Sequence, residues 1–470
     1  MKILTQKSPN KFYFLEINNT LRLQDTYQFL KAALQKLVFQ YAEKNDFLYL
    51  KKGLHEAYTI QENSKLYSLL KQQKGNFPFS FCTDVKKLYE KDFPEKKYFF
   101  NNLKNVEISD LDYENSKNIY KLSKCKNLGE YLTLYCFTDT LFLADIYLNY
   151  REIMFNDYSL DTCQNLTLPS YSMDCFLFDK YKEDPSFGLE LISNPQLSDI
   201  VNKNVRGGFC SLLSCKADFE NVSTWLGSIP TSAKEKLEKF VSDVIYLDVN
   251  SLYPYCMQEK LPYKNFMKLP KREMDHIYSL INTFNFAESD FGYWFLVTLA
   301  PNSHVVQEQS DMFPMALEKV TIRYDQLSQF MKHKVYNQSH KYERLVGHHF
   351  KKVEQLYDGE TLQFYMKRGI VVETVHAVYQ FEQMDYLKNY VNKNISKRKM
   401  TQCPIRGSIY KLFSNSIFGK FLTNELNYNN NSYICTNKRE FIKRLCNERF
   451  SSIKIINDNK VIINSKKKCY

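Results

Sequence analysis

Residues 244–257 read Val-Ile-Tyr-Leu-Asp-Val-Asn-Ser-Leu-Tyr-Pro-Tyr-Cys-Met, and the rest of the chain is organised around this stretch. The apolar, strand-favouring run from Val244 to Leu247 predicts a buried strand. Asp248 ends the run, and Ser251 and Pro254 are typical of a turn followed by a helix start. A carboxylate at the end of a buried strand, where the chain turns away, is well placed to hold a metal ion. An ordinary exposed Asp is the alternative for Asp248 taken alone.

A second motif lies downstream in residues 411–420, which read Lys-Leu-Phe-Ser-Asn-Ser-Ile-Phe-Gly-Lys. The spacing of Lys411, Asn415 and Phe418 places these three side chains on one face of a helix. Gly419 either permits the close approach of a ligand or ends the helix. A lone Lys on a helix is normally a solvated charge, so the interpretation of Lys411 depends on the whole string.

Together the two stretches resemble the family B DNA polymerases. The order Asp-x-x-Ser-Leu-Tyr-Pro is similar to motif A of that family. The downstream string is similar to motif B, Lys-x-x-x-Asn-Ser-x-Tyr-Gly, with Phe418 in the Tyr position. The resemblance is closest to the protein-primed branch, which includes polymerases of transposons, linear plasmids and some DNA viruses. It implies template-directed transfer of nucleotides from dNTPs to a primer 3′-hydroxyl.

The resemblance also implies roles for individual residues. Asp248 would be the catalytic carboxylate and would bind Mg²⁺ together with the Val249 carbonyl, and Tyr253 would reject a ribose 2′-hydroxyl. The residues expected to bind the nucleotide are Ser251, Leu252, Tyr253, Arg398, Lys411, Asn415 and Phe418. The residues expected to contact DNA are Arg206, Gly207, Gly208, Ser416, Gly419 and Lys420.

The segment before motif B predicts the first helix of a hairpin. Residues 386–399 are helical in character, and Pro404 and Gly407 are breakers before the second helix. Arg398 and Lys411 lie almost symmetrically about this break, so an antiparallel pair of helices would hold them at similar height. Two fixed cations suit a triphosphate, because Arg binds it bidentately and Lys acts as a point charge. The alternatives to Arg398 are its neighbours Lys397 and Lys399.

Upstream, a helix predicted over residues 131–153 carries Tyr135 and Asp139 one turn apart on the same face. This pair resembles the third exonuclease motif of the same polymerases, in which the Asp binds metal and the Tyr orients the attacking water. The short pattern is weak by itself and gains weight from its place upstream of motif A. The first two exonuclease motifs are not found, so we expect no cleavage, and a nuclease function is the least favoured hypothesis.

Residues 202–208, Asn-Lys-Asn-Val-Arg-Gly-Gly, lie between these two regions. The two glycines let the backbone approach a phosphate closely, and Arg206 adds positive charge. Family B polymerases often carry Tyr-x-Gly-Gly here in contact with DNA, whereas Val205 stands in the Tyr position of this chain. A plain turn is an equal alternative.

The remaining segments predict ordinary structural elements. The run from Phe12 to Ile17 predicts a strand, followed by an amphipathic helix with Asp25 as its N-cap and an apolar face from Phe29 to Val38. Asp110 and Asp112 favour a turn before a helix over a metal pair. Further strands are expected at 293–299 and 371–379, and a hairpin is expected at 455–461.

Composition limits the class of protein. Lys and Arg number 64 against 52 Asp and Glu, and the resulting charge of +12 suits a polyanionic partner without requiring one. The 12 cysteines include no C-x-x-C pair and no zinc set, so we expect free thiols in a reducing, intracellular compartment. No apolar run approaches the ~20 residues of a membrane-spanning helix, so no membrane partner is expected.

With 470 residues, the chain predicts several domains of the α+β class. Residues 1–160 would be a remnant of an RNase H-like 3′–5′ exonuclease domain, and residues 161–240 a linker and DNA-contact region. Residues 241–470 would be a polymerase palm and helical-hairpin fingers, with an insertion at about 265–380. Motif C, Asp-Thr-Asp, would lie beyond Tyr470, so we expect a piece of a polymerase cut at both ends.

The partners expected from the resemblance are template and primer DNA, dNTPs and, in the protein-primed branch, a terminal priming protein. The alternative function is a non-catalytic DNA-binding remnant of such a polymerase. Host, compartment and mode of priming stay open.

Overall fold

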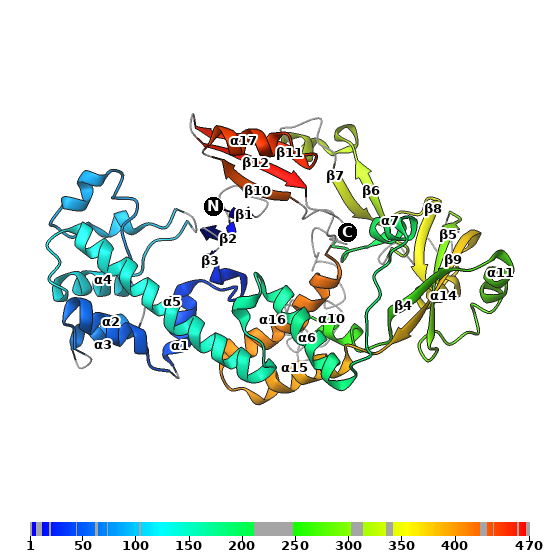
Figure 1. Ribbon diagram of the computed structural model, residues 1–470, viewed down its shortest axis with the longest axis horizontal. Helices are drawn as coiled ribbons and strands as arrows, with labels where there is room; N and C mark the ends of the chain where they lie inside the picture. Colours follow the sequence, from blue (N-terminus) through cyan, green and yellow to red (C-terminus); the bar gives the residue numbers. More distant parts are fainter. Residues whose placement is uncertain are drawn as a thin grey trace, which may run out of the picture. The chain divides into compact units, whose positions relative to one another are not determined.

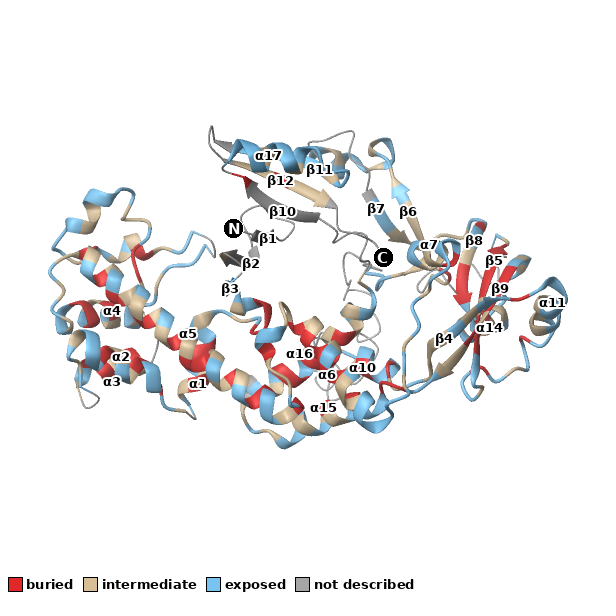
Figure 2. Cartoon of the chain, viewed as in Figure 1, coloured by how far each residue is buried: buried red, intermediate tan, exposed pale blue. Residues whose placement is uncertain are grey.

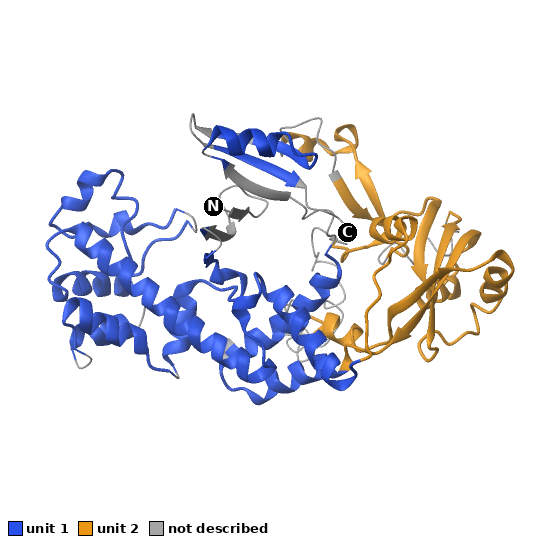
Figure 3. Ribbon diagram, viewed as in Figure 1, with its two compact units in different colours: residues 1–185, 389–470 blue, residues 186–388 orange. Residues whose placement is uncertain are grey.

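The computed structural model describes residues 2–5, 12–17, 20–43, 45–61, 64–72, 74–102, 105–210, 248–301, 314–334, 342–423, 430–435, 437–457 and 460–466. The chain divides into two compact units, coloured separately in Figure 3. Unit 1 comprises Met1–Pro185 and Asn389–Tyr470, and unit 2 comprises Ser186–Lys388. Among the described helices, none combines the length and the apolar content that crossing a bilayer requires.

Unit 1 contains a long helix, α5 (Leu128–Tyr158), whose 31 residues span roughly 46 Å at 1.5 Å per residue. The Asn127 side chain starts this helix by accepting a hydrogen bond from the backbone N–H of Glu130. Buried residues recur along the length of α5 (Figure 2). The other helices of unit 1 before residue 185 are η1 (Thr26–Gln28), α1 (Leu34–Ala42), α2 (Leu48–Tyr58), α3 (Lys65–Gln72), η2 (Val85–Tyr89), η3 (Lys96–Phe99), α4 (Asp110–Leu122), η4 (Thr162–Gln164) and α6 (Leu168–Glu183).

The helices around α5 are held by aromatic packing and by one buried carboxylate. The rings of Phe47 and Phe142 meet edge to face with centroids 4.8 Å apart, which joins the start of α2 to the middle of α5. Asp145 on α5 is only 4% exposed. Its carboxylate accepts the backbone N–H groups of Tyr49 and Leu50 at 2.9 and 3.0 Å, so it caps α2 from a neighbouring helix.

The second half of unit 1 contributes three described helices and part of a sheet. These elements are α15 (Lys388–Met400), α16 (Pro404–Phe421), β10 (Asn430–Cys435), α17 (Lys438–Leu445), β11 (Phe450–Asn457) and β12 (Lys460–Lys466). The three strands join β1 (Lys2–Thr5), β2 (Phe12–Ile17) and β3 (Leu21–Gln24) in one sheet of order β11-β12-β10-β1-β2-β3 (Figure 1). The link is the antiparallel pair β1–β10, in which Lys2 faces Tyr433. The two ends of the chain therefore share one sheet.

Unit 2 is organised on an antiparallel four-stranded sheet of order β4-β9-β5-β8. Its strands are β4 (Leu261–Lys268), β5 (Phe291–Leu299), β8 (Lys352–Asp358) and β9 (Val372–Met384). A separate ribbon pairs β6 (Glu318–Ile322) with β7 (Tyr342–Val346). The helices of unit 2 are α7 (Pro195–Asn204), α10 (Leu252–Cys256), α11 (Lys271–Ser279), η5 (Tyr324–Gln326), α13 (Gln329–Lys334) and α14 (Gly359–Lys367).

The four-stranded sheet has a hydrophobic core on each face. Successive side chains of its central strands point to opposite faces, and both sets are buried. One core joins β5 side chains such as Phe295 to Leu362 of α14 and to Met274 of α11. The other core packs Leu197 of α7 against Leu296 and Leu356. This second core fixes α7, and therefore the segment that follows it, against the sheet.

Several expected elements are confirmed. The α+β class is confirmed, and the strand from Phe12 to Ile17 has the predicted bounds. The helix predicted over 131–153 is present and longer, as α5. The Asp110–Asp112 stretch, predicted as a turn before a helix, instead forms the first turn of α4, which Ser109 caps. The strands expected at 293–299 and 371–379 correspond to β5 and β9, and the late hairpin corresponds to β11 and β12.

Two helix predictions were wrong in detail. Asp25 caps only the short η1, and α1 begins separately at Leu34, because Ala33 is extended. Pro404 and Gly407 do not separate the two hairpin helices: Pro404 lies in the first turn of α16, where its missing N–H has no intrahelical role, and Gly407 lies inside that helix. The strand predicted at 244–247 lies outside the described residues. The domain boundaries predicted at 160 and 240 stay predictions.

Candidate active site

The motif A residues lie in a short turn and helix of unit 2. Asp248 and Val249 are exposed and lead into α10, the helix that contains Tyr253. Pro254 in α10 is buried and Met257 after it is only 5% exposed, so burial of these two side chains anchors the helix. Tyr253 itself is 50% exposed. The turn and helix therefore expose Asp248 and Tyr253, while Pro254 and Met257 hold the helix in the protein interior.

Ser251 holds this turn in an unusual backbone conformation. Its φ of 54° and ψ of 43° place it in the left-handed region, which disfavours L-residues other than Gly, Asn and Asp by about 1 kcal/mol or more. Its side chain makes no capping hydrogen bond to α10. A non-glycine residue kept in a strained conformation marks a site where backbone direction matters. Here the strained residue sets the direction in which Tyr253 leaves the turn.

The motif B residues lie on α16 in unit 1. Lys411 is exposed, and among the described residues it has no hydrogen-bond or ion-pair partner. Asn415, Ser416, Phe418 and Lys420 are half-buried on the same helix. The opposite side of α16 is anchored in the core, where Phe413 and Ile417 are both fully buried. Phe413 and Ile417 therefore mark the core face of α16, and the exposed Lys411 marks its open face.

Gly419 does not end α16, which continues to Phe421. A Cβ atom at this position would meet no other atom within 4 Å. Gly in a helix interior destabilises the helix by about 1 kcal/mol relative to Ala. Within the described chain, no neighbouring atom requires a glycine at this position.

The helix before motif B carries the other expected cation. Arg398 is exposed near the end of α15, and no described residue binds its guanidinium. Lys399 is likewise exposed. Lys397 is different, because its ammonium lies 2.5 Å from a carboxylate oxygen of Asp157. This contact engages the Lys397 ammonium inside unit 1, and the choice among Arg398, Lys397 and Lys399 as phosphate ligand stays a prediction.

Buried polar contacts fix α15 and α16 against α5 and α6. The Ser172 hydroxyl on α6 donates to the Phe413 carbonyl at 3.0 Å and lies 3.0 Å from the Tyr390 hydroxyl. Tyr158 at the end of α5 donates to Asn394 on α15, and its ring lies 4.7 Å from Phe413. Both finger-like helices are therefore tied to the end of the long helix.

The exonuclease-like pair lies near the other end of α5. The Lys74 ammonium is 2.6 Å from the Asp139 carboxylate and 4.1 Å from the centre of the Tyr135 ring, and it donates to the Tyr135 hydroxyl. Tyr135 and Asp139 share a face, as predicted. Burial raises the pKa of Asp139 above its usual range and outweighs the opposing pull of Lys74. Sequence reasoning missed Lys74, because a lysine distant in the chain carries no local signal.

Arg206 is bound inside unit 2. Its guanidinium donates to the backbone carbonyls of Leu317 and Leu356 at 2.9 and 3.0 Å. It also donates to the side chains of Asn204 and Gln355, at 3.2 and 2.9 Å, and stacks over the Tyr357 ring at 4.5 Å. Four of its five N–H donors are therefore used inside unit 2, and the expectation that Arg206 contacts DNA stays a prediction. Gly207 and Gly208 are exposed, and a Cβ at either would meet nothing within 4 Å.

The described residues contain no group of three or more His, Cys, Asp or Glu side chains arranged to hold a metal ion. The predicted metal ligands, the Asp248 carboxylate and the Val249 carbonyl, both belong to exposed residues of the motif A turn. The predicted residues are distributed over both units: 248–253 belong to unit 2, and 398–420 belong to unit 1.

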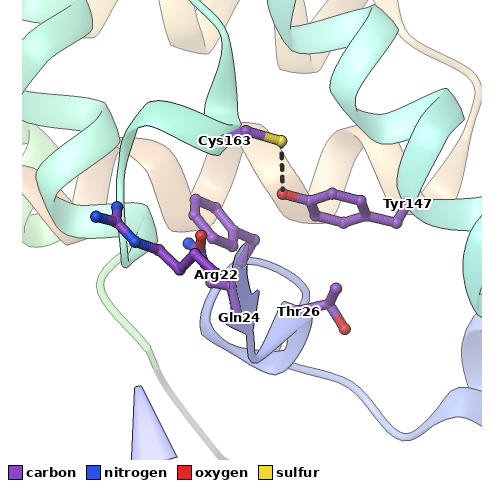
Figure 4. Close-up of a pocket in the computed structure, with 6 residues that line it drawn as sticks. Arg22, Gln24, Thr26, Tyr147 and Cys163 are labelled. Atoms are coloured by element: carbon purple, nitrogen blue, oxygen red, sulfur yellow. Dashed lines mark hydrogen bonds between the residues drawn. The ribbon is translucent and has the colours of Figure 1, made fainter. Parts of the chain in front are cut away.

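A pocket of about 290 Å³ lies in unit 1, and none of the predicted site residues lines it. It is lined by Arg22, Gln24, Thr26, Phe29, Tyr147 and Cys163. The Tyr147 hydroxyl points toward the Cys163 thiol at 3.8 Å (Figure 4). Burial raises the pKa of Tyr147 to about 12, so its hydroxyl stays protonated at neutral pH. No pattern in the sequence indicated this pocket.

The α+β fold and the order of the two motifs define a protein of the polymerase class. The family model described as "DNA polymerase type B, organellar and viral" matches residues 2–221 and 231–470, so the chain belongs to that family. This match confirms the resemblance to family B polymerases.

Individual relatives are more distant. A protein described as "Probable DNA polymerase" from Agaricus bitorquis is 27% identical over 198 residues, which cover 41% of this chain and 20% of that protein. A crystal structure of phi29 DNA polymerase is 13% identical, with a TM-score of 0.41, over 93% of this chain and 56% of that one. Phi29 DNA polymerase complexed with primer-template DNA and incoming nucleotides is 14% identical, with a TM-score of 0.42, over 93% and 55%. The chain thus spans a fifth to about half of the length of these relatives.

Proposed function

We propose that this chain carries the nucleotide-transfer part of a DNA-directed DNA polymerase, which adds nucleotides from dNTPs to a primer 3′-hydroxyl as a template directs. The observation that supports this most is the family match, because it runs through the residues of both motifs, 248–253 and 411–420. The open face of α16 adds support, because an exposed lysine and a half-buried aromatic side chain on a firmly anchored helix suit a polyanionic nucleotide.

Family B polymerases generally use divalent metal ions. We assign Mg²⁺ to the Asp248 carboxylate and the Val249 carbonyl, since both offer the hard oxygen atoms that Mg²⁺ prefers. Both residues lie in an exposed turn, so oxygens of a triphosphate can complete the coordination. A metal ion bound in this way stabilises negative charge on phosphate oxygens during phosphoryl transfer.

The other residues of the two motifs bind and orient the nucleotide. Arg398 and Lys411 neutralise the triphosphate, and both are free for this task among the described residues. Tyr253, exposed on α10, forms the floor of the sugar site and excludes a 2′-hydroxyl. The strained Ser251 and the adjacent Leu252 set its position, and Asn415 and Phe418 complete the nucleotide surface.

DNA is the second partner in the proposal. Ser416, Gly419 and Lys420 lie near the template or primer, and Gly207 and Gly208 let the backbone approach a phosphate. The domain assignment remains part of the proposal: an exonuclease remnant at 1–160, a DNA-contact region at 161–240, and palm and fingers at 241–470 with an insertion at about 265–380. A terminal priming protein is the further partner if priming follows the protein-primed branch.

Primer extension with Mg²⁺ and labelled dNTPs tests the function directly. Asp248→Asn keeps the size of the side chain and removes its charge, so it should abolish synthesis without unfolding unit 2. Asp275→Asn is the matched control, because Asp275 is an exposed acid on α11 of the same unit. Synthesis that survives in Asp248→Asn refutes the assignment of Asp248.

The second function is a DNA-binding remnant without catalysis, which the net charge of +12 also permits. Primer–template binding that weakens steeply with salt, together with no synthesis from the unaltered chain, would select this alternative.

A further inference from the structure

Asp157 joins the two helices that carry the predicted triphosphate-binding residues. One of its carboxylate oxygens accepts from the Lys397 ammonium of α15 at 2.5 Å. The other accepts from the Tyr410 hydroxyl of α16, also at 2.5 Å. Lys397 and Tyr410 immediately precede Arg398 and Lys411. A single carboxylate therefore holds the residue next to each cation.

The surroundings make this contact firm. Asp157 is the next-to-last residue of α5, where the negative end of the helix dipole disfavours a carboxylate unless a cation compensates. The side chains of Asp157 and Lys397 are 19% and 28% exposed, and Tyr410 is 4% exposed. Burial, together with the neighbouring carboxylate, raises the pKa of Tyr410, so its hydroxyl remains a hydrogen-bond donor at neutral pH. Charge-assisted bonds shielded in this way are stronger than exposed ion pairs.

The contact fixes direction as well as distance. Successive residues of an α-helix point about 100° apart around the axis. Holding Lys397 and Tyr410 toward Asp157 therefore sets the rotation of α15 and α16, and with it the direction of Arg398 and Lys411. Both cations are exposed and have no described partner. No contact of their own within the described chain aims them, so the neighbouring residues must do so.

We propose that Asp157 is a positioning residue for the triphosphate: through Lys397 and Tyr410 it aims Arg398 and Lys411 at the phosphates of the incoming nucleotide. This inference rests on the proposed function. It assigns to α5 a part in nucleotide binding that neither polymerase motif contains.

A neighbouring ion pair provides a matched control. Asp179 on α6 binds the ammonium of Lys393 on α15 at 2.6 Å, and the two side chains are 22% and 34% exposed. This pair has nearly the same chemistry and burial as the pair of Asp157 with Lys397. It holds one helix only, and Lys393 does not adjoin a predicted phosphate ligand.

The test measures equilibrium binding of dTTP with Mg²⁺ to the full chain in the presence of primer–template DNA. Asp157→Asn should weaken dTTP binding about 3- to 10-fold, while Asp179→Asn should change it less than about 2-fold. Tyr410→Phe removes only the hydroxyl donor and should also weaken binding, which keeps the test open if Asp157→Asn does not fold. Circular dichroism confirms that each variant is folded.

A double-mutant cycle separates positioning from general stability. If Asp157 acts through the two cations, Asp157→Asn should have no further effect once Arg398→Ala and Lys411→Ala are present. An equal loss in both backgrounds, or no loss in the unaltered background, overturns the inference while the proposed function stands. If Arg398→Ala with Lys411→Ala leaves dTTP binding unchanged, the proposed role of the two cations fails, and the inference fails with it.

Discussion

Replacing Arg206 by Gln distinguishes a structural arginine from a DNA contact. The variant removes the positive charge and most of the guanidinium N–H donors that bind four acceptor groups in unit 2. Because the guanidinium holds the segment after α7 to β8 and to residue 317, we expect Arg206→Gln to destabilise unit 2. We expect it to leave the number of phosphate contacts unchanged.

The size of the effect follows from the contacts. A hydrogen bond contributes about 0.5–1.5 kcal/mol net, and Gln can replace about one of the four. The stack on Tyr357, at 4.5 Å, adds about 0.5–1 kcal/mol. The loss in unfolding free energy should therefore be about 2–5 kcal/mol.

Two measurements check this prediction. Hydrogen exchange at the amides of β8 reports the stability of unit 2 alone, which matters because the two units need not unfold together. The Leu356 amide is a direct probe, since it donates to Asn204 at 2.9 Å. Arg368→Gln is the matched control: Arg368 is exposed and stacks over Phe364 at 3.6 Å, so its loss should cost about 0.5 kcal/mol or less.

The salt dependence of primer–template binding decides the role of Arg206. An arginine that binds a phosphate contributes about 0.9 to the slope of log affinity against log salt concentration. A slope that falls by this amount in Arg206→Gln, with β8 exchange unchanged, would refute the structural role. Weaker binding at every salt concentration with an unchanged slope agrees with a structural arginine beside Gly207 and Gly208.

Three further predictions concern unit 1. Gly419→Ala and Gly407→Ala should each stabilise α16 by up to about 1 kcal/mol in thermal unfolding, but only Gly419→Ala should weaken primer–template binding; equal binding by both variants would contradict close approach at Gly419. The pKa of Asp139 is raised in the folded state, so folding takes up a proton at this carboxylate between the ordinary and the raised pKa values. As pH falls through this window, the unfolding free energy of the unaltered chain should therefore rise relative to that of Asp139→Asn. A difference that shrinks on acidification would mean that attraction by Lys74 outweighs burial. Asp145→Ala should remove the cap of α2 and destabilise that helix by about 1–2 kcal/mol, seen as faster amide exchange in α2, whereas unchanged exchange would show that the cap is dispensable.

Local patterns predicted single elements well. The strand from Phe12 to Ile17 follows from side chains within a few residues of each other. The division of α16 into buried and open faces follows from helical periodicity alone. Asp25 shows the limit of this reasoning: it does cap a helical turn, but a local signal for a helix start does not set the length of the helix.

Partners distant in the sequence were not predictable. The first strand, β1, pairs with β10, more than four hundred residues away, and neither segment contains a pattern that predicts this pairing. Arg206 was predicted to contact DNA because the sequence shows its charge but not its distant acceptors. Three of its four acceptors lie 111 to 150 residues away, in Leu317, Gln355 and Leu356. Lys74 beside Asp139 was missed for the same reason.

The sequence by itself determined which functional side chains lie close together: Asp248 near Tyr253, and Lys411 at helical spacing from Phe418. It also determined the family to which the chain belongs. The tertiary structure alone decided which of the charged groups remain available. It uses Arg206 and Lys397 in internal contacts and leaves Arg398 and Lys411 open. The physical reason is that a motif is defined by neighbours along the chain, whereas the partner of a charged group depends on packing between elements far apart in sequence.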